Sequence, residues 1–132
     1  MKKTIIVILS SVLLLTTLPA NAASKPLNSK ENKNSCTHIK TNYKSSVISD
    51  WSNGLATDQD VIKEIESNIK MLSTRAAYTN GKIKVQVRSW LTAEKKTRSS
   101  LINNDVNGIS DAMKLKISSV NNLNKLCKSI GK

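Results

Sequence analysis

The sequence predicts an all-α fold, an up-down-up-down four-helix bundle clamped by one disulfide, and three observations support this. Asn-Gly pairs at 53–54, 80–81 and 107–108 divide the chain at equal intervals, and Asn-Gly is a typical turn or helix-stop signal. Apolar residues between these pairs recur with a helical period. Two distant cysteines, Cys36 and Cys127, are placed to join the first helix to the last.

Residues 1–22 have the three parts of a secretory signal peptide. Two lysines form the positive start, an apolar run covers 5–18, and Ala20 and Ala22 occupy the positions that a signal peptidase recognises. The apolar run is shorter than the ~20 residues needed to cross a bilayer, which disfavours a membrane anchor. We therefore expect cleavage before Ala23, a secreted or periplasmic bacterial protein, and no transmembrane segment in the mature chain.

The predicted mature chain begins with a polar segment, 23–35, whose charged and aperiodic composition indicates flexibility. The helical domain is expected over 36–132. An oxidising compartment favours a disulfide between Cys36 and Cys127, because a reactive thiol would need a nearby base or a CxxC spacing.

Four helices are expected, over 36–53, 58–78, 82–103 and 108–130. The second is the clearest, because its apolar residues form one stripe and Thr57 begins a capping box with Asp60. The third is less clear, since 82–88 alternates with period two and also fits an edge strand, but a single strand would have no partner. The expected apolar stripes are Ile39, Tyr43, Val47 and Trp51; Val61, Ile62, Ile65, Ile69, Leu72 and Ala76; Ile83, Val87, Trp90, Leu91 and Leu101; and Ile109, Met113, Val120, Leu123, Cys127 and Ile130.

Few side chains suggest catalytic chemistry. His38 is the only histidine of the chain and falls on the outer side of the first predicted helix, which disfavours Ser-His-Asp or Cys-His catalysis. No cluster of His, Cys, Asp and Glu has metal-ligand spacing, and no Gly-rich loop is present to bind phosphate. We therefore expect no enzyme, no catalytic residue, no cofactor and no metal site.

Glu94 lies on the apolar stripe of the third predicted helix, one turn before Arg98, with which it can form an ion pair. Lys40, Lys44 and Lys116 lie near the other stripes. The favoured interpretation places all of them at the edges of the bundle, with their charged heads in water. The alternative is a polar layer that fixes the register of the helices, or an opening for a ligand.

Charge gives the clearest indication of function. The formal net charge is +12, and residues 82–132 carry 11 basic and 3 acidic side chains against 8 and 6 in residues 23–81. Such an excess predicts an anionic polymer or an acidic protein as partner, and a merely solvated basic surface is the alternative. The residues expected on the outward faces of the third and fourth helices are Lys84, Arg88, Lys95, Lys96, Lys114, Lys125 and Lys128, with Lys132 beyond them.

Two classes of function fit these patterns. The first is a non-enzymatic exported module that docks an anionic cell-envelope polymer, such as a teichoic acid or lipopolysaccharide phosphates, or an acidic partner. Specific nucleic-acid recognition is not expected, because lysines far outnumber arginines and both tryptophans lie on predicted core stripes. The second class is an inhibitor or immunity protein that caps a secreted or periplasmic toxin or hydrolase.

Overall fold

The computed structural model describes residues 27–42 and 50–130, and this part of the chain contains helices and no strands. Helix α2 covers Lys30–Asn42, α4 covers Asp58–Tyr78, α5 covers Gly81–Ile102 and α6 covers Val106–Ile130. The all-α prediction is confirmed, and 82–88 belongs to a helix. The predicted signal peptide lies outside the described residues, as do Tyr43, Lys44, Val47 and Lys132.

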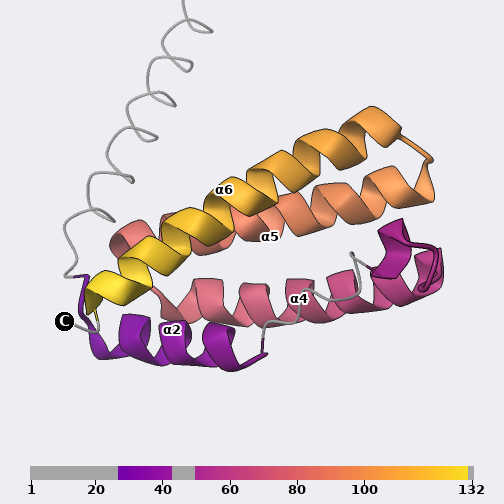
Figure 1. Ribbon diagram of the computed structural model, residues 1–132. Coiled ribbons are helices and arrows are strands. Elements are labelled where there is room, and N and C mark those ends of the chain that lie inside the picture. The colour runs from indigo at the N-terminus through magenta and orange to yellow at the C-terminus, as the bar shows by residue number, and fades with distance from the viewer. Residues whose placement is uncertain (1–26, 43–49, 131–132) are drawn as a thin grey trace, which may run out of the picture.

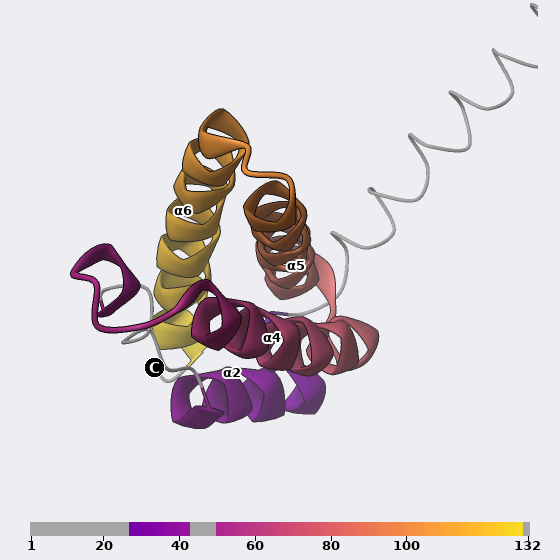
Figure 2. The same cartoon turned by 90° about the vertical axis from the view of Figure 1, so that its right-hand side faces the viewer.

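The three long helices pack against one another in chain order, with α4 antiparallel to α5 and α5 antiparallel to α6 (Figure 1). The shorter helix α2 lies along one end of α4, near the C-terminal end of α6 (Figure 2). Helix α2 has 13 residues against 21 to 25 in the long helices, so the expected four helices of similar length are not found in the described residues.

Helix α2 begins at Lys30, inside the segment that was expected to be flexible. The Ser29 Oγ accepts a hydrogen bond from the Asn32 backbone N–H, which is a typical N-cap. The Asn32 side chain is buried, donates to the Leu27 carbonyl and accepts a hydrogen bond of 2.8 Å from the Asn80 backbone N–H. This polar start is therefore fixed by a distant turn, which the polar composition of 23–35 does not indicate.

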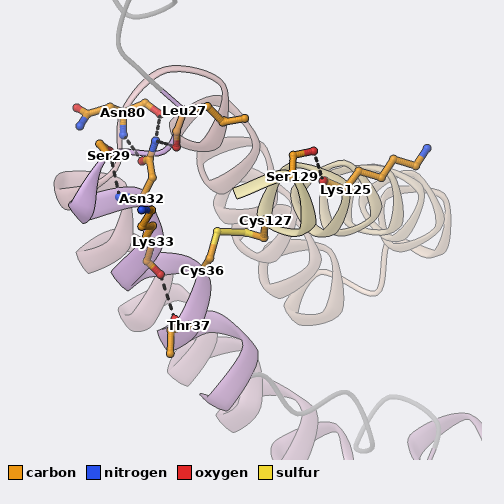
Figure 3. The surroundings of a disulfide bond; sticks show 10 residues. All are labelled: Leu27, Ser29, Asn32, Lys33, Cys36, Thr37, Asn80, Lys125, Cys127 and Ser129. Carbon is orange, nitrogen blue, oxygen red and sulfur yellow. Dashed lines mark hydrogen bonds between the residues drawn. A yellow bond between two sulfur atoms is a disulfide. The ribbon is translucent and has the colours of Figure 1, made fainter. Parts of the chain in front are cut away.

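The Cys36–Cys127 disulfide is confirmed, with a Cα–Cα distance of 5.7 Å (Figure 3). It joins α2 to the last turns of α6 beside an apolar cluster that all four helices share. The buried members of this cluster are Ile39, Leu72, Ala76, Ile83, Val87, Trp90 and Leu123. The disulfide therefore holds the short helix against the main apolar core.

Two of the three predicted turns are correct. Gly54 has φ +72° and Gly81 has φ +53°, both in the left-handed region that glycine tolerates. The capping box at the start of α4 is confirmed, with reciprocal bonds between Thr57 and Asp60.

The prediction of a turn at 107–108 is wrong, because both residues lie inside α6. The chain turns instead at Asn104, which has φ +53°, and the Asp105 carboxylate accepts a hydrogen bond from the Gly108 N–H. A Cβ at Gly108 would overlap the Ser100 Oγ and the Asp105 carboxylate. Glycine is therefore present here for the close approach of α5 and α6, and not for a turn.

The buried face of α6 also differs from the predicted stripe. Its most buried residues are small or polar, whereas the predicted apolar residues other than Leu123 are only half-buried at the edge of this face. Small side chains let α5 and α6 approach closely, which turns the larger residues aside. The buried residues of α6 are Gly108, Ala112, Lys116, Ser119 and Leu123.

Candidate functional site: a basic surface over a buried ion pair

The predicted basic residues of α5 and α6 lie mostly at the surface. Lys84 is half-buried, and the other six, Arg88, Lys95, Lys96, Lys114, Lys125 and Lys128, are exposed. Within the described residues, the ion pairs are those of Arg98 with Glu66 and of Lys116 with Glu94, and neither involves these seven side chains. Their charges are therefore available to a partner.

These basic residues form two stripes and not one continuous face. At 100° per residue, Lys84, Arg88 and Lys95 share one flank of α5, and Lys95 borders a hollow that Glu66, Ile69 and Arg98 also line. On α6 the three lysines Lys114, Lys125 and Lys128 share the side opposite the buried face. The structure therefore brings together three of the four predicted residues of α5 and the three of α6, whereas Lys96 lies about 100° around α5 from Lys95.

A shallow groove between α5 and α6 links the two helices with cations from both. Lys82 and Lys125 line this groove together with Val85, Gln86, Asn122 and Leu126. Lys82 was not among the predicted site residues, although its position beside the Asn80-Gly81 turn and its charge were visible in the sequence. The antiparallel packing of α5 on α6 places the start of one helix beside the end of the other.

The acidic side chains are distributed differently from the basic ones. Helix α4 exposes Asp58, Asp60 and Glu66, whereas the only acid of α5, Glu94, is fully buried. Helix α6 exposes one acid, Asp111. Because Glu94 is buried, all the exposed charged side chains of α5 are cations.

Glu94 is the centre of a buried polar cluster that connects α4, α5 and α6. Its Oε1 lies 2.9 Å from the Lys116 Nζ and accepts a hydrogen bond of 2.8 Å from the Trp90 indole N–H. The Asn68 amide donates to the same oxygen at 3.4 Å. The Glu94 and Lys116 side chains are 1% and 4% exposed, so both lie in the interior of the protein.

The prediction that Glu94 and Lys116 lie at edges with their heads in water is therefore wrong, as is the pairing of Glu94 with Arg98. Arg98 reaches across to α4 instead, where its Nε donates to the Glu66 Oε1 at 3.1 Å. The geometry fits the alternative interpretation, a polar layer between the helices. The buried Glu94 carboxylate lies beside an opposite charge and hydrogen-bond donors, as a buried charge requires. The sequence contained the signal, a carboxylate on an apolar stripe, but not the identity of its partner.

Glu64 of α4 adds a second carboxylate to this cluster. Burial raises the pKa of Glu64, the positive charge of Lys116 opposes this rise, and the negative charge of Glu94 adds to it. Both oxygens of Glu64 are inaccessible and have no hydrogen-bond partner among the described residues. Because the Glu94–Lys116 pair is enclosed, we interpret the cluster as a device that sets the register of the three helices.

The remaining predicted features occupy ordinary positions. His38 is exposed, as expected, and borders a hollow between α2 and α4, and Lys40 is exposed. Trp90 is buried in the core, whereas Trp51 is half-buried and donates its indole N–H to Asp58. Over residues 27–42 and 50–130, no three His, Cys, Asp or Glu side chains are grouped as metal ligands, and no helix is long and apolar enough to span a membrane.

The comparisons with known proteins do not add a family to this description. No protein-family model, no curated protein sequence and no solved structure matches the chain. The function must therefore be inferred from the geometry and charge of the chain itself.

Proposed function

We propose that the protein is an exported, non-enzymatic basic helical module that docks an anionic cell-envelope polymer through the outer surface of α5 and α6. Export is supported by the signal-peptide pattern of residues 1–22 and by the disulfide, which is typical of oxidising compartments. The proposed contact residues are Lys84, Arg88, Lys95, Lys96, Lys114, Lys125 and Lys128, with Lys82 added from the groove between the two helices.

The observation that carries this proposal is the separation of charges between surface and core. The single carboxylate of α5 is neutralised inside by Lys116, while the seven proposed contact cations of α5 and α6 have no carboxylate partner within the described residues. Unpaired like charges on a surface repel one another, and an anionic polymer relieves this repulsion while releasing its own counterions.

An extended polymer fits this surface better than a compact anion or a specific nucleic acid. The cations are spread along two long helices, and the groove that links them is shallow and mainly apolar. Base stacking needs exposed aromatic side chains, and Trp90, the only aromatic residue of α5 and α6, is buried. Repeated phosphates along a flexible chain can meet cations at irregular intervals.

The test is binding of poly(glycerol phosphate), a teichoic-acid-type polymer, to the oxidised protein by titration calorimetry. We expect the affinity to fall steeply between about 50 and 200 mM salt, because each contact releases counterions. Replacing Lys96, Lys114 and Lys125 with Gln should weaken binding by about tenfold or more and give a shallower salt dependence.

The matched control replaces Lys33, Lys63 and Lys70, which are exposed on α2 and α4, with Gln. This variant loses the same charge, so a direct contact surface on α5 and α6 predicts a much smaller effect. Equal weakening by both triple variants would indicate attraction by net charge alone and contradict the docking surface. A flat salt response would contradict the proposal entirely and leave the inhibitor hypothesis as the next to test.

A further inference from the structure

A hollow of about 540 Å³ lies at the surface beside the disulfide. It lies between α2 and α6, with α5 beneath, and its size is within the range of small-molecule sites. Its apolar lining consists of the half-buried Val120 and the disulfide together with the buried side chains of Ile39, Trp90 and Leu123. The disulfide itself forms part of the wall, so the distance between the two helices that bound the hollow is fixed covalently.

The rim of this hollow has a defined charge. Lys40, near the end of α2, and Lys128, near the end of α6, both line it and are both exposed. Thr37 and Asn124 are the other polar side chains of the lining, which contains no carboxylate. Cations and neutral polar groups thus surround an apolar floor.

This combination matches one kind of ligand. An apolar floor gains free energy by covering hydrocarbon, whereas two ammonium groups at the rim favour an anionic head that stays near water. A polymer of phosphates has no tail to cover the floor, and a small anion leaves the floor exposed. The volume accommodates a ligand with one hydrocarbon chain, whereas a ligand with two hydrocarbon chains needs a larger site.

We propose that this hollow binds one single-chain anionic amphiphile, with its tail against Val120 and the disulfide, next to the buried Trp90, and its head between Lys40 and Lys128. The ligand class is that of a free long-chain fatty acid. The proposal is independent of polymer docking, because the polymer surface uses the outer sides of α5 and α6, and only Lys128 belongs to both.

The buried indole of Trp90 provides the readout. Its ring lines the hollow while its N–H is held by Glu94 at 2.8 Å, so a tail in the hollow changes the surroundings of a fixed fluorophore. In the full oxidised protein carrying Trp51→Phe, Trp90 is the only tryptophan. Titration with palmitate below its micelle concentration should give a saturable change in emission with one site per chain.

The rim is tested by replacing Lys40 and Lys128 with Gln in the same background. We expect palmitate to bind about tenfold more weakly to this variant. The matched control is Lys63→Gln with Lys70→Gln, which removes two exposed charges elsewhere and should leave the affinity unchanged. Hexadecanol, which has the tail without the charge, should bind more weakly than palmitate to the protein with intact lysines.

The floor is tested by Val120→Phe, which fills the hollow from its half-buried edge and should abolish binding. Asn124→Phe enters the hollow from an exposed position and serves if the first variant does not fold, as judged by circular dichroism. No emission change with palmitate, equal weakening in the control pair, or binding only to phosphatidylglycerol vesicles would overturn the proposal. Because Val120→Phe leaves the polymer surface intact, failure here is distinguishable from failure of polymer docking.

Discussion

The two ends of the packed helices bury different kinds of side chain. At the end that carries the disulfide, the buried residues are mostly large and apolar, and they form the cluster of Ile39, Leu72, Ala76, Ile83, Val87, Trp90 and Leu123. Toward the opposite end, α5 and α6 bury small or polar side chains instead. These are Ala93, Glu94, Thr97, Ser100, Gly108, Ala112, Lys116 and Ser119.

This difference indicates that stability and specificity are divided between the ends. Burying large apolar side chains stabilises by about 1.5–3 kcal/mol each but tolerates several packings of similar volume. A buried ion pair contributes little net stability, but it penalises every arrangement in which its partners are separated. We therefore expect the disulfide end to contribute most of the stability. We expect the Glu94–Lys116 pair to determine the register in which the helices pack.

Removing the disulfide is expected to have the largest effect. The double variant Cys36→Ala with Cys127→Ala releases a constraint between residues 91 positions apart. The chain-entropy estimate for such a loop is a loss of about 4–5 kcal/mol in the free energy of unfolding, comparable to the whole stability of a small domain. Urea denaturation of the oxidised protein and of the variant measures this difference.

Hydrogen exchange shows where the loss falls. Protection should decrease most in α2, whose contacts with α4 and α6 are few compared with those among the long helices. A loss of protection centred on the turn at Asn104 instead would contradict the assignment of stability to the disulfide end.

Breaking the buried ion pair should have the next largest effect. Lys116→Met leaves the Glu94 carboxylate buried without its cation, and we expect a loss of about 3–5 kcal/mol at neutral pH. Glu94→Gln leaves the Lys116 ammonium without its anion, although the amide oxygen still accepts from Trp90. Combining the two substitutions removes both charges and should recover most of the stability lost in either single variant.

The coupling in this double-mutant cycle separates an ion pair from ordinary packing. Losses that simply add, as measured by urea denaturation of all four proteins, would contradict a direct interaction between Glu94 and Lys116. Arg98→Gln is a useful reference, because its ion pair with Glu66 is exposed, with side chains 43% and 52% accessible, and should contribute about 1 kcal/mol or less.

The sequence predicts the disulfide end better than the polar end, for a physical reason. Leu72 and Ala76 of α4, like Ile83 and Val87 of α5, recur with the helical period because apolar side chains must face the core, and periodicity detects this directly. Gly108 and Lys116 belong to the same buried face as Leu123, but neither residue type is apolar and bulky. Their burial follows from a neighbour on another helix, which no local pattern contains.

The same reasoning applies to the candidate site. The outward cations were predicted individually, since charged residues opposite an apolar stripe face solvent. Their separation into two stripes, the addition of Lys82 and the hollow beside Cys127 depend on how α2, α5 and α6 pack. The start of α2 at Lys30 was missed for a similar cause, because Asn32 is fixed by Asn80 and not by an apolar period.

The smallest expected effect concerns Glu64 and its dependence on pH. Because the pKa of Glu64 is raised above its ordinary value of 4.5, the folded protein binds this proton more tightly than the unfolded chain does. Stability from this group is therefore greatest when Glu64 is protonated and decreases as pH rises from the ordinary pKa through the raised one. The groups that face it are Glu94 of α5, which strengthens the shift, and Lys116 of α6, which weakens it.

Glu64→Gln imitates the protonated side chain, so it should stabilise the protein slightly at neutral pH and have no effect at acidic pH. The gain is small because Glu64 as a residue is only half-buried and the positive charge of Lys116 compensates part of the cost of burying its carboxylate. The difference in unfolding free energy between the variant and the original protein, measured from about pH 4 to pH 7, should therefore grow with pH. Glu66→Gln is the matched control, because its exposed carboxylate pairs with Arg98 and its removal should not stabilise. A difference that stays constant over this range for Glu64→Gln would place Glu64 outside the polar cluster and confine the register-setting device to Glu94 and Lys116.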